Sequence, residues 1–361
     1  MLYLRRFICG AVVTGVLALS GLCQTPATAQ DQEQQPAEPD TVALLEAAQA
    51  AQTSGEHQSA TQLYEQALDR LLAAENTSAA AECARELMVC YNHCGDLTQA
   101  ASFAERASEL FLAAADPTGA AQVMTSWACL LRARNEYEQA AAAYNRALTL
   151  YANTNNTQGQ ASTELSLGVL ADLRGDLDQA VQHFSQAQQL YHQDGDQASE
   201  ALCHSNQAYA LSRQYQYEEA LAHYQECLVL YHDLGLTTEL AEAHEQRGDT
   251  YEHLSDWSRA MADYNSAIVL LAEIGDTLKQ ADCHCCLGRV LLNIDSPTSA
   301  RSHLEEAWRL YLELGKPAEL EAILPDLEQA LAVCDDQSAI ERYRAQLDEL
   351  KANRNESPAG Y

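Results

Sequence analysis

The sequence predicts an all-α fold, an α-solenoid of stacked antiparallel helix pairs, from two observations. The first is a repeat of 40 residues that keeps its register for about 260 residues without an insertion. The second is that small residues recur at fixed places in this repeat, at every fortieth position and again seven positions later. The two columns are Ala60, Ala100, Ala140, Ala180, Ala220, Ala260 and Ala300, and Ala67, Ala107, Ala147, Ala187, Cys227, Ala267 and Ala307. Because such repeats stack on their neighbours, we expect function on the surface rather than in a globular active site.

Each 40-residue unit is expected to hold two helices. In the unit 241–280, the second half places Ala260, Tyr264, Ala267, Ile268 and Leu271 at i, i+4, i+7, i+8 and i+11, which are helical spacings. The first half has its own apolar face. Between the halves lie short junctions such as Gly95-Asp96 and Gly175-Asp176, where glycine supplies a left-handed residue and the acid favours the next helix start.

The small columns indicate where two helices approach closely, and the aromatic residues beside them fill the remaining space. Gly168, Gly248 and Gly288 stand in the middle of predicted helices, where glycine lowers helix propensity. We expect these glycines to face the alanine columns.

The spacing from Leu167-Gly168 through Ala180 and Phe184 to Ala187 resembles a tetratricopeptide repeat (TPR). The longer unit of this chain is similar to the repeats of kinesin light chains and MalT-type bacterial regulators. The resemblance implies a right-handed TPR superhelix that acts as a non-enzymatic protein-binding module. It covers 41–320 as seven tandem 40-residue units, and we interpret 321–350 as a C-terminal capping helix pair and 351–361 as a loose tail.

The first 40 residues carry a separate signal. Arg5 and Arg6 precede an apolar run that ends at Cys23, and Ala27-Thr28-Ala29 provides a cleavage site of small residues. We therefore predict a signal peptide at 1–29, followed by a disordered linker at 30–40, and an exported, periplasmic or secreted protein. The apolar run is also long enough to remain as an uncleaved membrane anchor.

The charge of the chain is strongly acidic. It has 52 Asp and Glu against 21 Lys and Arg, a formal net charge of −31. Such a surface repels nucleic acid and anionic membranes, so we expect a protein or peptide partner, with basic partners favoured.

Motifs for catalysis and for a bound cofactor are missing from the sequence. It contains no G-x-S-x-G, H-E-x-x-H, P-loop or G-x-G-x-x-G, so we predict no enzyme activity and no cofactor. A column of His204, His244 and His284 lies beside cysteines, but successive helices pack too far apart for one column to surround an ion, so we predict no metal site. We expect these histidines to donate to backbone carbonyls. Cys203 and Cys227 are the one pair that we consider for a disulfide.

The candidate binding residues lie on the first helices of the sixth and seventh units. Because first-helix positions line the concave groove in the TPR family, the resemblance implies a groove formed by Glu242, Glu245, Asp249, Glu252 and Asp282, with Tyr209 one unit earlier. Our hypothesis is a module that binds a peptide or helix of a partner in this groove. The alternatives are a structural subunit of an envelope complex and a metal- or redox-responsive repeat protein that uses its Cys and His residues. An ordinary solvated face would also explain the acidic stripe.

Overall fold

The computed structural model describes residues 39–333 and 336–356, and all regular structure within these ranges is helical. The first eight helices are α2 (Pro39–Thr53), α3 (His57–Ala73), α4 (Thr77–His93), α5 (Leu97–Ala113), α6 (Pro117–Ala133), α7 (Tyr137–Asn153), α8 (Thr157–Arg174) and α9 (Leu177–Asp194). The next eight are α10 (Gln197–Arg213), α11 (Tyr217–Leu234), α12 (Thr237–His253), α13 (Trp257–Ile274), α14 (Thr277–Asn293), α15 (Pro297–Glu313), α16 (Pro317–Ala332) and α17 (Gln337–Glu356).

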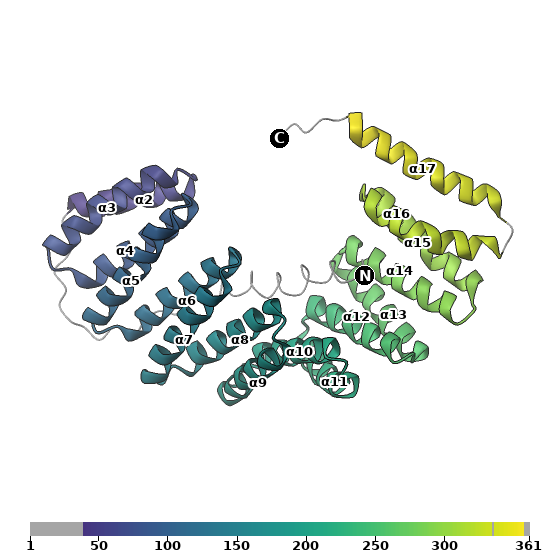
Figure 1. Ribbon diagram of the computed structural model, residues 1–361, viewed down its shortest axis with the longest axis horizontal. Coiled ribbons are helices and arrows are strands. Elements are labelled where there is room, and N and C mark those ends of the chain that lie inside the picture. Colours follow the sequence, from purple (N-terminus) through teal and green to yellow (C-terminus); the bar gives the residue numbers. More distant parts are fainter. Residues whose placement is uncertain (1–38, 334–335, 357–361) are drawn as a thin grey trace. The chain divides into compact units, whose positions relative to one another are not determined.

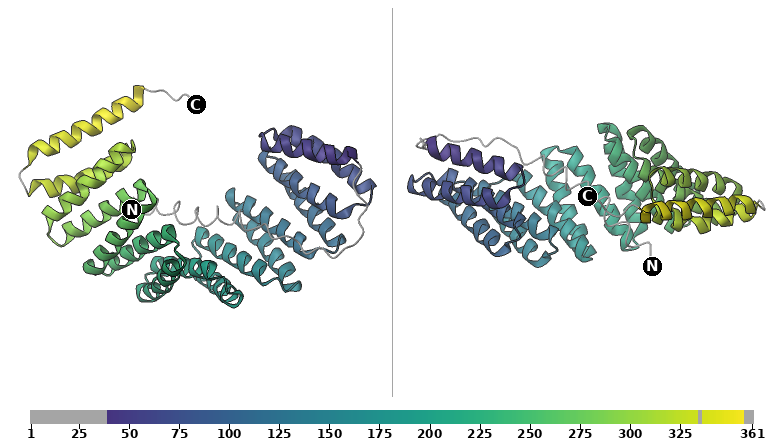
Figure 2. Two further views of the ribbon diagram at one scale, coloured as in Figure 1. Left: turned by 180° about the vertical axis from the view of Figure 1, so that it is seen from behind. Right: turned by 90° about the horizontal axis from the view of Figure 1, so that it is seen from above.

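The chain divides into two compact units, 1–196 and 197–361. Within each unit every helix packs against the next along the chain, and the tightest pairs are the two helices of one repeat (Figure 1). The views in Figure 2 show the same succession of neighbouring helices in each unit from behind and from above. The predicted all-α architecture of stacked antiparallel helix pairs is therefore confirmed.

The turns between helices follow the predicted chemistry. Gly95 and Gly175 adopt φ values of 83°, and Asn135 takes the same left-handed conformation with φ of 64°. Asp96 then caps α5, because its carboxylate accepts a hydrogen bond from the backbone N–H of Gln99 at 3.0 Å. A left-handed residue followed by a capping acid therefore fixes both the end of one helix and the start of the next.

Both small columns lie in the core. Every residue of the two columns, from Ala60 to Ala300 and from Ala67 to Ala307, is fully buried. Aromatic side chains lie beside them, and Tyr144, Tyr224 and Tyr264 are among the largest side chains that are fully buried. The sequence therefore predicted the phase of the helices correctly.

The mid-helix glycines were expected to face the alanine columns, and only Gly288 does so in part. A Cβ atom on Gly168 would lie 2.5 Å from Cδ1 of Phe184, and one on Gly248 would lie 2.9 Å from Cε1 of Tyr264. A Cβ atom on Gly288 would lie 2.6 Å from Cγ of Leu304 and 3.5 Å from the backbone oxygen of Ala300. Phe184, Tyr264 and Leu304 belong to the column four positions after the first alanine column, which we call the large column, and its side chains require the absence of a side chain at these glycines.

Two further expectations need correction. Residues 351–356 were predicted to belong to a loose tail, but α17 continues through them to Glu356. Cys203 and Cys227, the one pair considered for a disulfide, are both buried free thiols.

None of the helices within 39–333 and 336–356 combines the length and the apolar character needed to cross a membrane. The signal peptide predicted at 1–29 and the linker up to residue 38 lie outside the described residues, so they remain predictions.

Candidate binding surface

Five carboxylates meet on two neighbouring first helices. Helix α12 carries Glu242, Glu245, Asp249 and Glu252, and α14 carries Asp282. We call these five residues the acidic cluster. All five are partly buried. The negative charges of Glu242, Asp249 and Asp282 all act on Glu245, so these four side chains lie near one another.

A lysine that the sequence analysis did not assign to this site neutralises one member of the cluster. Lys279, on the first turn of α14, forms an ion pair with Glu242 on α12. The Lys279 side chain is mostly buried, with 23% of its surface exposed. The signal was available, because Lys279 precedes Asp282 by three residues and so shares its helix face.

Two buried tyrosines also reach the acidic cluster. The hydroxyl of Tyr264 on α13 lies 2.6 Å from Oδ1 of Asp249 and 3.0 Å from Oε2 of Glu252. Tyr311 on α15 donates to Asp282. Both tyrosines are core residues, so the rings that fill the core also present hydroxyl donors to the carboxylates.

Burial changes the protonation of the cluster. It raises the pKa of Glu245 to about 8, and the neighbouring charges of Asp249 and Asp282 add to this effect. Burial also raises the pKa of Asp249 to about 7, although the hydrogen bond from Tyr264 opposes the change. The pKa of Glu252 is raised for the same reason. The cluster therefore carries less negative charge at neutral pH than its five carboxyl groups suggest.

Tyr209 lies one repeat earlier, on α10. The guanidinium of Arg213 stacks over its ring at 5.7 Å from the centroid. Tyr209 and Asp249 both act electrostatically on the hydroxyl of the buried Tyr224, so both lie near this hydroxyl. Arg213 gives this end of the predicted surface a positive group that the sequence analysis did not include.

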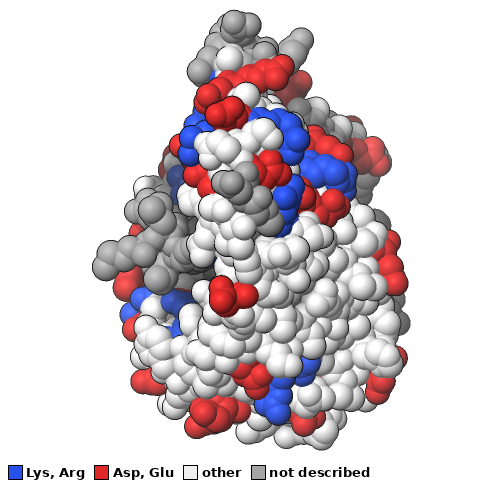
Figure 3. Space-filling model, turned by 90° about the vertical axis from the view of Figure 1, so that its right-hand side faces the viewer, with Lys and Arg blue, Asp and Glu red and all other residues white. Residues whose placement is uncertain are grey.

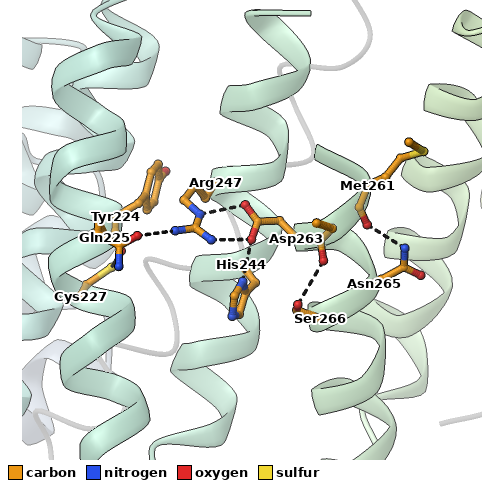
Figure 4. A network of polar contacts seen from close by, with 10 residues as sticks. Tyr224, Gln225, Cys227, His244, Arg247, Met261, Asp263, Asn265 and Ser266 are labelled. Atoms are coloured by element: carbon orange, nitrogen blue, oxygen red, sulfur yellow. Dashed lines mark hydrogen bonds and ion pairs between the residues drawn. The ribbon is translucent and has the colours of Figure 1, made fainter. Parts of the chain in front are cut away.

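A hydrogen-bonded network fixes α12 on its neighbours on both sides (Figure 4). Arg247 donates to both carboxylate oxygens of Asp263 on α13, at 2.8 Å and 2.7 Å, and to Gln225 on α11 at 3.0 Å. Burial disfavours the ionised form of Asp263, but the hydrogen bonds from Arg247 and His244 outweigh it and lower its pKa. The network holds in place the helix that carries most of the acidic cluster.

The histidine column bonds to side chains of the following helix, where we had expected bonds to backbone carbonyls. Nδ1 of His244 lies 2.8 Å from Oδ1 of Asp263. His204 and His284 pair in the same way with residues of the helix that follows each of them. Within 39–333 and 336–356, no three His, Cys, Asp or Glu side chains lie close enough together to hold a metal ion as they stand.

The acidic excess of the chain does not form one continuous patch on the face drawn in Figure 3. There Asp and Glu side chains are scattered among uncharged residues, and several lie beside Lys or Arg. Net charge alone therefore does not mark a binding site.

Comparison with known proteins gives one family match. The model of the soluble NSF attachment protein family, SNAP, matches residues 117–237, which is about a third of the chain. No curated protein matches the sequence.

Solved structures resemble this chain over longer stretches. A signal transduction ATPase with a tetratricopeptide repeat sensor from Pyrococcus horikoshii matches with a TM-score of 0.61 at 14% identity, over 80% of this chain but only 44% of its own length. BtubC from P. vanneervenii matches with a TM-score of 0.54 at 17% identity, over 66% of this chain and 91% of its own. Aspartyl phosphate phosphatase F from Bacillus subtilis matches with a TM-score of 0.53 at 12% identity, over 91% of this chain and 88% of its own. At these identities the likeness concerns the fold alone, which is a helical-repeat fold of the tetratricopeptide type.

Proposed function

We propose that the protein is a non-enzymatic interaction module that holds a basic peptide or helix of a partner protein against the acidic cluster of α12 and α14. The observation that carries this proposal is Glu245. It has no hydrogen-bond or ion-pair partner among the described residues, whereas Glu242 is paired with Lys279 and Asp249 accepts from Tyr264. A partner cation at Glu245 would supply the missing counter-charge.

The chemistry of the cluster favours a guanidinium or ammonium group as the anchor. The pKa of Glu245 is raised because burial and the neighbouring carboxylates outweigh the opposing charge of Lys279. An incoming Arg or Lys adds positive charge, which stabilises the ionised form and displaces the proton. Arg suits the site better, because its planar donors can bridge Glu245 and a neighbouring carboxylate such as Asp282.

The fold supports a binding role in a general way. Stacked helix pairs expose long rows of first-helix positions, which are used to bind extended or helical segments. In the Pyrococcus relative, the tetratricopeptide repeats form the sensor of a signal transduction ATPase. Placement of the peptide along the row of α10, α12 and α14 is part of our proposal.

The test is titration with a fluorescent peptide rich in Arg and Lys, and with an equally long peptide rich in Glu. We expect only the basic peptide to bind, with affinity that falls as salt rises. Glu245→Gln should weaken binding by about tenfold, which corresponds to about 1.4 kcal/mol. It is a better probe than reversal of Asp249, because Asp249 also holds the buried Tyr264.

The matched control is Glu218→Gln with Glu219→Gln, two exposed acids on the second helix α11. These changes remove more charge but should leave binding unaltered. Equal binding by wild type and Glu245→Gln, or equal binding of the acidic peptide, would overturn the proposal and leave the acidic cluster as a solvated face.

Export is a separate proposal that the sequence of residues 1–29 supports. N-terminal sequencing of the protein isolated from its native cells should begin near Gln30. A soluble cytoplasmic protein with an intact Met1 would contradict it.

A further inference from the structure

One internal contact recurs in four successive repeats. It joins a residue of the first helix to the residue 19 positions later, on the second helix of the same repeat. The pairs are Glu164–His183 at 2.7 Å, His204–His223 at 2.9 Å, His244–Asp263 at 2.8 Å and His284–His303 at 3.0 Å. Two of these pairs join a histidine to a carboxylate, and the other two join a histidine to a histidine.

The His284–His303 contact connects α14 to α15 in the seventh repeat. The two Nδ1 atoms lie 3.0 Å apart, and the ring centroids lie 5.3 Å apart. This is hydrogen-bond distance, so one neutral imidazole donates its Nδ1–H and the other accepts at an unprotonated Nδ1. The donor ring therefore carries its proton on Nδ1, and the acceptor ring carries its proton on Nε2.

Two successive protons have opposite effects on this contact. A first proton taken up at Nε2 of the donor ring leaves the Nδ1–H and the facing lone pair in place, so the hydrogen bond becomes charge-assisted. A second proton occupies that lone pair. Two N–H groups and two positive charges then face each other, and no acceptor remains between them. The contact is therefore retained in the singly protonated pair and lost in the doubly protonated pair.

The surroundings of the pair favour uncharged rings. Both histidines are partly buried. Burial and the charge of His303 lower the pKa of His284 to about 4, and burial lowers the pKa of His303. Two charged groups of α15 also act on His284, and of these Glu306 raises its pKa and Arg309 lowers it. Among the described residues, α13 and α16 add no further charge that acts on either ring.

We propose that the His284–His303 contact is acid-sensitive: it holds α14 on α15 at neutral pH and releases this helix pair once both imidazoles are protonated. His284 has a lower pKa in the folded chain than its ordinary 6.5, so its contribution to stability is fully present above pH 6.5 and is lost as the pH falls through 4. The same helix pair carries the hydrogen bond from Tyr311 to Asp282, so its release would also disturb the acidic cluster.

The sixth repeat provides a contrast at the equivalent positions. His244 faces the carboxylate of Asp263, so protonation of this imidazole strengthens the contact instead of breaking it. Hydrogen bonds from Arg247 and His244 lower the pKa of Asp263 and keep it ionised in mild acid. Acid should therefore loosen the seventh repeat at a pH at which this contact of the sixth repeat still holds.

The fifth repeat has the same histidine–histidine contact in a different charge environment. Burial and the charge of His204 lower the pKa of His223, but the nearby Glu219 and Glu226 raise it. We therefore expect a weaker response to acid in this repeat than in the seventh.

The experiment compares the full-length chain with His303→Asp, which copies the histidine–carboxylate pair of the sixth repeat. Hydrogen–deuterium exchange at pH 7 and pH 5, corrected for intrinsic exchange rates, measures how often each helix pair opens. In the wild type, opening of α14 and α15 should become about tenfold more frequent at pH 5, whereas in His303→Asp it should change by less than about threefold. Helices α12 and α13 should respond alike in both proteins. The matched control, His232→Asn, changes a histidine whose side chain is 78% exposed and should behave as the wild type does.

Nuclear magnetic resonance of wild-type protein labelled with ¹⁵N-histidine keeps the test decisive if the variant fails to fold. A coupling between the two Nδ1 atoms across the hydrogen bond identifies the pair. At pH 7 one ring should carry its proton on Nδ1 and the other on Nε2, and the coupling should disappear as the second proton binds, with an apparent pKa of about 4. The proposal is overturned if both rings carry only Nε2 protons at pH 7, if α14 and α15 of the wild type open no more often at pH 5, or if folded His303→Asp responds to acid as the wild type does.

Discussion

Replacing Gly168 with alanine tests our conclusion that the large column, and not the alanine columns, determines where glycine is needed. A Cβ atom there would lie 2.5 Å from both Cδ1 and Cε1 of Phe184, about 1 Å inside an ordinary contact. Phe184 is only 2% exposed, so its ring has little room to move. At Gly248, the equivalent position two repeats later, the nearest ring atoms of Tyr264 would lie 2.9 Å and 3.0 Å away, a smaller overlap.

Two opposing effects set the magnitude. Alanine in the middle of a helix is favoured over glycine by about 1 kcal/mol. Overpacking of a tight core costs about 1–3 kcal/mol. With the larger overlap, Gly168→Ala should have a net cost of about 1–2 kcal/mol, whereas Gly248→Ala should change stability by less than about 1 kcal/mol because the two effects nearly cancel.

The assay is urea unfolding followed by circular dichroism. A second change, Phe184→Leu, makes room for the new methyl group, so the double variant should be more stable than the sum of the two single effects predicts. Stabilisation of the protein by Gly168→Ala, or strict additivity with Phe184→Leu, would refute the assigned contact.

Further predictions concern the core, the acidic cluster and the thiols. Ala180→Leu should cost about 1–3 kcal/mol through overpacking, whereas Gln189→Leu at an exposed position should stay within about 0.5 kcal/mol; equal unfolding midpoints would mean that the helix phase is wrong. Tyr264→Phe removes the donor to two carboxylates and should lower stability by about 1–3 kcal/mol in the same assay. The pKa of Glu245 is raised from its ordinary value of 4.5 to about 8 in the folded protein. The contribution of Glu245 to stability is therefore fully present below pH 4.5 and is lost as the pH rises through 8. Glu245→Gln should therefore melt at a higher temperature than wild type at about pH 9, and the difference should shrink toward about pH 5. The nine described cysteines should react as free thiols in denaturant without reductant, and extensive disulfide formation would contradict this.

The fold was predictable because its determinants repeat. Alanine at every fortieth position fixes where helices touch, and Gly95-Asp96 or Asn135-Glu136 fixes where they turn. Each of these signals acts within one or two turns of helix. Seven copies of the same signal then remove the ambiguity that a single copy would leave.

The candidate site was only partly predictable, because its decisive contacts join different helices. Helical spacing placed Glu242, Glu245 and Asp249 on one face. It did not show that Lys279 forms an ion pair with Glu242 or that Tyr264 donates a hydrogen bond to Asp249. Those contacts depend on how far each side chain reaches across a helix pair. The same limitation left the partner of His244, the Asp263 carboxylate, unidentified.

The side-chain contacts of the histidine column join residues 19 positions apart, such as His244 and Asp263, and both members lie within a single repeat. Because both members of a pair such as His204–His223 lie on one helix hairpin, duplication of the segment 201–240 copies the complete pair. A repeat can therefore be gained or lost together with both residues of its side-chain pair. Unequal recombination between repeats of this kind would change the number of complete pairs, because neither member of a pair would be gained or lost without the other.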